Sequence, residues 1–191
     1  MSTKIYKNQY GHEINENQID YTEIYYKEIH ESGIKKIVEH ISENETTHIS
    51  YYLSTTETIA AVLLQFSNKK ITFVSTSFSN TYKVEEQFYY ENSNLLMKSK
   101  NILDSNGNAI CFQKLDIVTN SPILGSTEKI FINANGSRKY FFDYNDDGTC
   151  FIINDYELDE QILPSTIGQP NIDFTWVGFE YYQNALPIIP L

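Results

Sequence analysis

Apolar and polar residues alternate along most of this chain, in runs of roughly five to ten positions. Over 46–53, for example, Thr47, Ile49, Tyr51 and Leu53 occupy every second position, which is typical of a strand with one buried face. Similar runs cover 20–30, 70–78, 81–90, 95–104, 109–118, 128–133, 137–144, 149–156 and 173–182, and a short segment at 4–7 is typical of an edge strand. The pattern predicts about ten strands.

Four short glycine turns separate pairs of these runs. They end in Ser32-Gly33, Asn106-Gly107, Asn135-Gly136 and Asp147-Gly148. Asn-Gly and Asp-Gly supply the positive φ that tight hairpins need, so each turn predicts two antiparallel strands. Hairpins that follow one another in this way indicate an antiparallel meander.

The segment 34–41 fits two patterns. Its apolar positions, 34, 37, 38 and 41, have helical spacing. The turn before it and the strand-like runs on both sides favour a strand, which we expect. Ser54 and Glu57 have the spacing of a capping box. We therefore expect one short helix over about 55–66.

The composition agrees with a β-rich fold. Hydrophobic residues make up 41% of the 191 residues, with 15 Tyr and 11 Phe, which is enough for a core. We predict a single β-rich domain over 1–191, because one hydrophobic core accommodates a chain of this length. The expected fold class is mainly β, a curved antiparallel meander with one short helix.

The net charge of −11 restricts the partners. An acidic field repels phosphate backbones and anionic membranes, so nucleic-acid and membrane binding are disfavoured, and a basic protein is favoured. The start is polar, and the longest apolar run covers only 59–64, so we expect a cytoplasmic protein. Cys111 and Cys150 are the only cysteines. Free thiols are favoured, and a disulfide between the two is the alternative.

The segment Lys139-Tyr140-Phe141-Phe142-Asp143-Tyr144-Asn145-Asp146-Asp147-Gly148 resembles the YD-type hairpins of bacterial Rhs proteins. The glycine-tipped hairpins are also similar to small bacterial antitoxin or immunity-like β proteins. The likeness covers about 40 residues, and the turn glycines lack the fixed period of a repeat array. The resemblance implies a hairpin scaffold and, for the immunity-like proteins, neutralisation of a toxin.

Seven carboxylates gather between 143 and 160 with no Lys or Arg among them. They are interpreted either as a solvated face or as a surface that docks a cationic partner. The residues are Asp143, Asp146, Asp147, Asp155, Glu157, Asp159 and Glu160.

Part of this stretch also has the spacing of a calcium loop. Asp143, Asn145 and Asp147 match the first half of an EF-hand, but Asn154 replaces the final Glu and no helix follows. A hairpin turn is therefore favoured over calcium, and we expect no cofactor.

The aromatic run 174–183 is predicted to be a covered strand, with an exposed binding patch as the alternative. That patch would consist of Trp176, Phe179, Tyr181 and Tyr182. The histidines, at 12, 30, 40 and 48, do not pair at metal-ligand spacing, and no catalytic motif is present.

These observations suggest a non-catalytic interaction protein of the bacterial cytosol. The leading hypothesis is an immunity-type protein that neutralises a cationic toxin domain. The alternative is a small-molecule-binding, barrel-like β protein with an aromatic-lined cavity. A monomer and an edge-paired homodimer are both compatible with the sequence.

Overall fold

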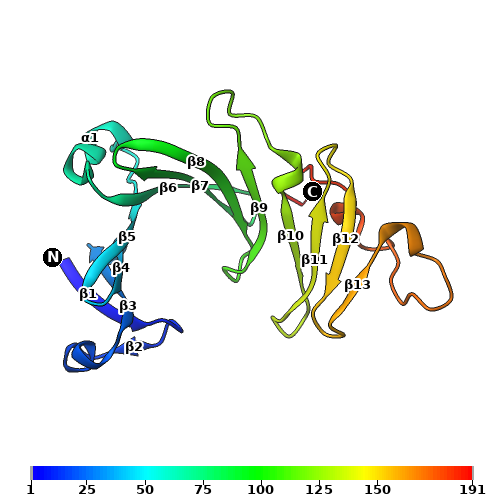
Figure 1. The fold of residues 1–191 in the computed structure, drawn as a ribbon, viewed down its shortest axis with the longest axis horizontal. Helices are drawn as coiled ribbons and strands as arrows, with labels where there is room; N and C mark the ends of the chain where they lie inside the picture. Colours follow the sequence, from blue (N-terminus) through cyan, green and yellow to red (C-terminus); the bar gives the residue numbers. More distant parts are fainter. Residues whose placement is uncertain (1, 191) are drawn as a thin grey trace. The chain divides into compact units, whose positions relative to one another are not determined.

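The computed structural model describes residues 2–190, and the fold is mainly β (Figure 1). Thirteen strands form an open, mostly antiparallel sheet in the order β13-β12-β11-β10-β9-β8-β7-β6-β5-β4-β3-β1-β2. Their bounds are β1 Ser2–Asn8, β2 Glu13–Ile14, β3 Ile24–Glu31, β4 Ile34–Ser42, β5 Glu45–Tyr52, β6 Lys70–Ser79, β7 Tyr82–Glu91, β8 Asn94–Leu103, β9 Ala109–Leu115, β10 Glu128–Ile132, β11 Arg138–Tyr144, β12 Cys150–Asp155 and β13 Glu160–Ile162. The predicted mainly β meander is confirmed.

The helical elements are short. Among residues 2–190 the single α-helix is α1, Ile59–Leu63, and the 3-10 helices are η1 Glu16–Tyr21, η2 Leu64–Phe66, η3 Leu124–Ser126, η4 Pro164–Thr166 and η5 Glu180–Tyr182. Together α1 and η2 make the one short helix that the sequence predicts. It begins later than expected, because Ser54 and Glu57 close a separate turn and Thr58 caps the helix through Ala61.

The chain divides into two compact units, which are described one at a time. Unit 1 contains Met1–Thr76 and Gln87–Met97, and unit 2 contains Ser77–Glu86 and Lys98–Leu191. Strands β6, β7 and β8 contribute residues to both. The single domain over 1–191 stays a prediction.

All four predicted glycine turns join antiparallel strands. Gly33, Gly107, Gly136 and Gly148 have φ between 81° and 86°, the left-handed region that favours glycine. Other hairpin turns use residues with weaker turn signals, such as Asn44 at φ 63°. The segment 34–41 is strand, as predicted, and forms most of β4.

Three other expectations need correction. Strand β1, which includes the predicted edge strand at 4–7, lies between β2 and β3. Strands β2 and β13 were not predicted. The run 173–182 is not a strand: it is irregular chain that ends in η5, with Gly178 at φ 83°.

Unit 1 contains a parallel pair, β5 with β6, joined through α1 (Figure 1). A parallel neighbour cannot be reached by a tight turn, so the chain crosses over through the helix. Val62 of α1 covers Ile49, Tyr51, Ile71 and Phe73 of these two strands, all buried. The core of this unit therefore lies on the α1 side of the sheet.

In unit 2, the segment 174–189 packs on β9–β12. Phe174 and Ala185 join the buried Tyr140, Phe142, Tyr144 and Ile153 in one apolar cluster. Strand β13 pairs with Ile153–Asp155 of β12, and the chain near Asn184 pairs with Thr149, just before β12. Irregular chain thus completes this core.

Candidate functional site

The seven predicted partner-binding carboxylates do not share one face. Three lie at or near the β11–β12 turn, and four lie at the other end of β12, at the β12–β13 turn. The first group is Asp143, Asp146 and Asp147; the second is Asp155, Glu157, Asp159 and Glu160.

Two of these carboxylates serve the turns themselves. Asp147 accepts hydrogen bonds from the backbone N–H and the hydroxyl of Thr149, at 2.8 and 2.6 Å. Asp155 is buried and accepts the backbone N–H groups of Glu157 and Leu158, at 2.8 and 3.1 Å. Such Asx turns fix the loop, so these two side chains are less available to a partner.

The β12–β13 turn keeps a surface that a partner can reach, which we call the acidic edge (residues 155–163). Glu157, Asp159 and Glu160 are exposed. Tyr156 is 60% exposed and Leu158 64%, so two large apolar side chains lie between carboxylates on this surface. Beside them is an open hollow of about 290 Å³, lined by Asn154, Asp155, Tyr156, Asp159, Glu160 and Gln161.

Positive charge is scarce around the acidic edge. No Lys or Arg follows Lys139 in the sequence, whereas nine Asp and Glu do. Lys139 itself forms an ion pair with Glu157, at 3.1 Å. The charges of Asp159 and Glu160 have no recorded ion pair among the described residues, so the acidic edge stays negative.

The three candidate calcium ligands form hydrogen bonds within the β11–β12 hairpin. Asp143 lies on β11 and accepts a hydrogen bond from Asn154, at 3.1 Å. Asn145 donates to the Thr149 hydroxyl, which also bonds Asp147. Within residues 2–190, no three His, Cys, Asp or Glu side chains are grouped so that they could hold a metal. The favoured hairpin turn is the structure that forms.

Asp143 instead faces a carboxylate that the sequence reasoning missed. Glu128 on β10 lies directly opposite Asp143 on β11, and both are half-buried. Burial and the neighbouring Asp143 raise the pKa of Glu128, and burial raises the pKa of Asp143. Like charges opposite each other destabilise a sheet, so this pair favours uptake of a proton.

The predicted aromatic patch lies mostly against the core. Trp176, Phe179 and Tyr182 are partly buried and pack around Phe142, with the Tyr182 ring 4.5 Å from the Phe142 ring. The Tyr181 hydroxyl donates to the Ile188 carbonyl, at 2.6 Å. These contacts match the covered interpretation of the aromatic run rather than an exposed patch.

A fully buried lysine holds this segment. Lys129 Nζ donates to the backbone carbonyls of Tyr181, Asn184 and Pro187, at 2.7, 2.8 and 2.8 Å. The ammonium also lies 3.7 Å from the centre of the Tyr181 ring. Burial lowers the pKa of Lys129 to about 8, so the ammonium remains charged at neutral pH.

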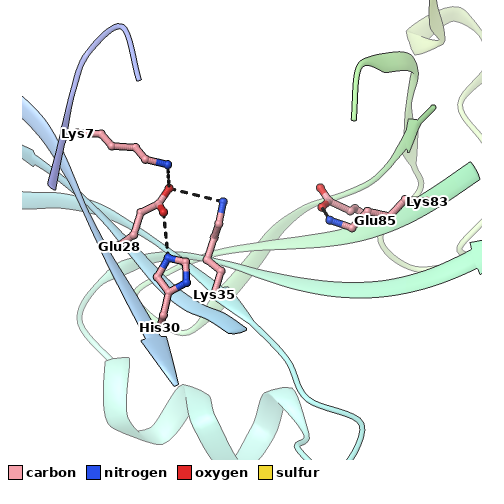
Figure 2. A network of polar contacts seen from close by, with 6 residues as sticks. All are labelled: Lys7, Glu28, His30, Lys35, Lys83 and Glu85. Carbon is pink, nitrogen blue, oxygen red and sulfur yellow. Dashed lines mark hydrogen bonds and ion pairs between the residues drawn. The ribbon is translucent and has the colours of Figure 1, made fainter. Parts of the chain in front are cut away.

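Three of the four histidines lie on one face of unit 1. His30 shares the Glu28 carboxylate with two lysines, and Figure 2 shows Lys7 and Lys35 extending toward it. His40 and His48 lie opposite each other on β4 and β5. In unit 2, Figure 2 shows a separate pair on β7, Lys83 with Glu85 at 2.6 Å.

The hollows of the surface are open and largely polar. One of about 540 Å³ lies beside β1 and η1 and includes Asn8, Gln18 and Tyr21 in its lining. Another, of about 510 Å³, lies between the turns that contain Asn106 and Asn135. Neither is lined by a ring of aromatic side chains.

Both cysteines are free thiols, Cys111 buried and Cys150 half-buried. No helix among the described residues is long and apolar enough to cross a membrane. No protein-family model, curated protein or solved structure matches the chain.

Proposed function

We propose that this chain is a non-catalytic, immunity-type protein that neutralises a cationic toxin domain, and that the acidic edge is its contact surface. One observation carries the proposal: Tyr156 and Leu158 are 60% and 64% exposed between the carboxylates of Glu157, Asp159 and Glu160. Exposed apolar anchors inside a charged rim are typical of protein interfaces.

The two kinds of residue have different roles in this proposal. Tyr156 and Leu158 bury apolar area on a partner and contribute most of the affinity. The carboxylates accelerate association with a basic surface and discriminate against acidic ones. A basic nuclease domain fits best, because an acidic protein can occupy a surface built for phosphates.

The test is binding to a basic protein at graded salt. The immobilised chain is incubated with a lysate of the source bacterium at low salt and eluted in salt steps, and the recovered basic protein is then purified. We expect the purified protein to bind directly, to lose affinity steeply as salt rises, and to lose its toxic activity in the complex.

Two charge-matched variants locate the surface. Asp159→Lys/Glu160→Lys reverses two charges of the acidic edge, and Glu43→Lys/Glu45→Lys reverses two exposed charges at the β4–β5 turn in unit 1. We expect at least tenfold weaker binding for the first variant only. Equal effects from both variants, or binding that does not depend on salt, would contradict the proposal.

The small-molecule alternative has less support. It requires an aromatic-lined cavity, whereas the aromatic residues of 174–182 pack against Phe142 and its neighbours. A metabolite that raises the melting temperature strongly in a thermal-shift screen would restore this alternative.

A further inference from the structure

We propose that His40 and His48 form a two-histidine binding site for a divalent transition metal ion such as Ni²⁺, Cu²⁺ or Zn²⁺. The site lies wholly in unit 1 and is independent of the acidic edge.

The register of the sheet places the two histidines directly opposite each other. His40 on β4 and His48 on β5 are direct partners in an antiparallel ladder, where opposite Cβ atoms lie about 4.5–5.5 Å apart. Metal–nitrogen bonds of about 2.0–2.1 Å place two ligand nitrogens about 3 Å apart on one ion. Two directly opposite imidazoles are therefore close enough for one nitrogen of each to bind the same ion.

Each ring is held through one nitrogen. The Thr47 hydroxyl lies 3.3 Å from Nδ1 of His40, and the Thr72 hydroxyl lies 3.1 Å from Nε2 of His48. Within residues 2–190, no polar partner is recorded for the other nitrogen of either ring. An oriented imidazole with one free lone pair is the usual arrangement of a histidine ligand.

The ring faces are covered, and the ring edges carry the ligand nitrogens. Tyr26 stacks on His40 at 4.7 Å between ring centres, and Tyr89 lies 5.8 Å from His48. The lone pairs point outward in the ring planes, so this packing does not obstruct metal coordination. Thr47 also contacts the His40 carbonyl where the β4–β5 register shifts, which fixes the backbone there.

The charges nearby allow a cation to bind. The neighbouring Lys70 ammonium pairs with the Glu91 carboxylate, at 3.5 Å, which offsets its repulsion of a metal cation.

The ligand set selects the kind of metal. Imidazole suits Ni²⁺, Cu²⁺ and Zn²⁺, whereas Mg²⁺ and Ca²⁺ require oxygen ligands. No third His, Cys, Asp or Glu joins the pair among the described residues, so water completes the coordination sphere. We therefore expect moderate affinity and exchangeable metal.

The experiment titrates the full, tag-free chain with NiCl₂ and ZnCl₂ by calorimetry and thermal shift. We expect binding of one ion per chain, at least tenfold weaker in His40→Gln and in His48→Gln. The matched control is His12→Gln, an exposed histidine in the β1–β2 turn, and it should bind like wild type. CaCl₂ and MgCl₂ should not shift the melting temperature.

A second measurement needs no substitution. Cu²⁺ broadens the NMR signals of nearby nuclei, so the imidazole signals of His40 and His48 should disappear first in wild type. Broadening that begins at His12 or His30, or no Ni²⁺ binding at millimolar concentration, would overturn the proposal. Unchanged affinity in both single variants would do the same.

Discussion

Replacing Lys129 by Met tests the role of the buried ammonium most directly. Met preserves much of the apolar stem but leaves the carbonyls of Tyr181, Asn184 and Pro187 without their donor. A hydrogen bond from a charged donor contributes about 1.5–3 kcal/mol, and an unsatisfied buried carbonyl costs about 1–3 kcal/mol. Because burying the ammonium is itself costly, we expect a net loss of about 3–5 kcal/mol.

The assay is urea unfolding at pH 7, with Lys139→Met as the matched control. Lys139 lies on the neighbouring strand β11 and forms a surface ion pair with Glu157, and exposed ion pairs contribute little to stability. Hydrogen exchange adds a local readout. The amide of Ala185, which donates to the Gly148 carbonyl at 2.7 Å, should exchange faster in Lys129→Met. Equal unfolding midpoints for the two variants would refute the reasoning.

The same variant also tests the pKa of the lysine. Burial lowers it to about 8 in the folded chain, below the ordinary value of about 10.4. The unfolded chain therefore binds more protons between these pH values, so the free energy of unfolding rises with pH there. The stability difference between wild type and Lys129→Met should grow from pH 8 to pH 10. A stability difference that shrinks over this range would mean that the hydrogen bonds to the carbonyls raise the pKa of Lys129 more than burial lowers it.

Three further changes should alter stability in defined directions. Glu128→Gln removes the repulsion from Asp143 and should raise the free energy of unfolding at pH 7 by about 0.5–1 kcal/mol. This gain should disappear at acid pH, because the raised pKa values of Glu128 and Asp143 let the wild-type pair bind a proton there. Gly148→Ala should cost about 1–2 kcal/mol, because φ is 86° and the new Cβ would lie 3.1 Å from Leu124; thermal unfolding measures it. Burial raises the pKa of Glu57, but hydrogen bonds, the largest from the Lys36 ammonium, outweigh burial and lower the pKa to about 2. Wild type should therefore lose stability as the pH falls from about 5 to 2. Acid titration of Glu57→Gln should show a smaller loss of stability.

Hairpin structure was predictable because its signals are local. Alternation over each strand and a glycine at the tip of each turn lie within a few residues of each other, as around Gly107. The turn at Glu43 and Asn44 lacks glycine and still adopts positive φ. Asn44 tolerates this conformation, but it is a weaker turn signal than glycine, so the turn is harder to locate from the sequence.

The aromatic run 174–182 shows where alternation fails. Both faces of a strand there would be apolar, which favoured a covered strand. The segment instead surrounds Phe142 with rings from an irregular backbone, which Gly178 bends at φ 83°. Hydrophobicity predicted that the aromatic rings pack against the core, but it contains no information on the backbone path, and Val177 within the run is exposed.

The pairs that matter for chemistry depend on register. His40 meets His48, and Glu128 meets Asp143, because particular residues of neighbouring strands lie opposite each other. A shift of one residue would point these side chains to opposite faces. Bulges, such as the one after His40, make the register harder to count from the sequence.

The contacts of Lys129 also have a kinetic consequence. They span 52, 55 and 58 residues, whereas the hairpins around them close over a few residues. Closing a long loop costs more entropy and follows the formation of local contacts, so β9–β12 should assemble before the segment 181–187 arrives. During synthesis on the ribosome, the Lys129 ammonium would remain hydrated until that segment emerges. Desolvation of this one charge would then coincide with the final step of folding in unit 2.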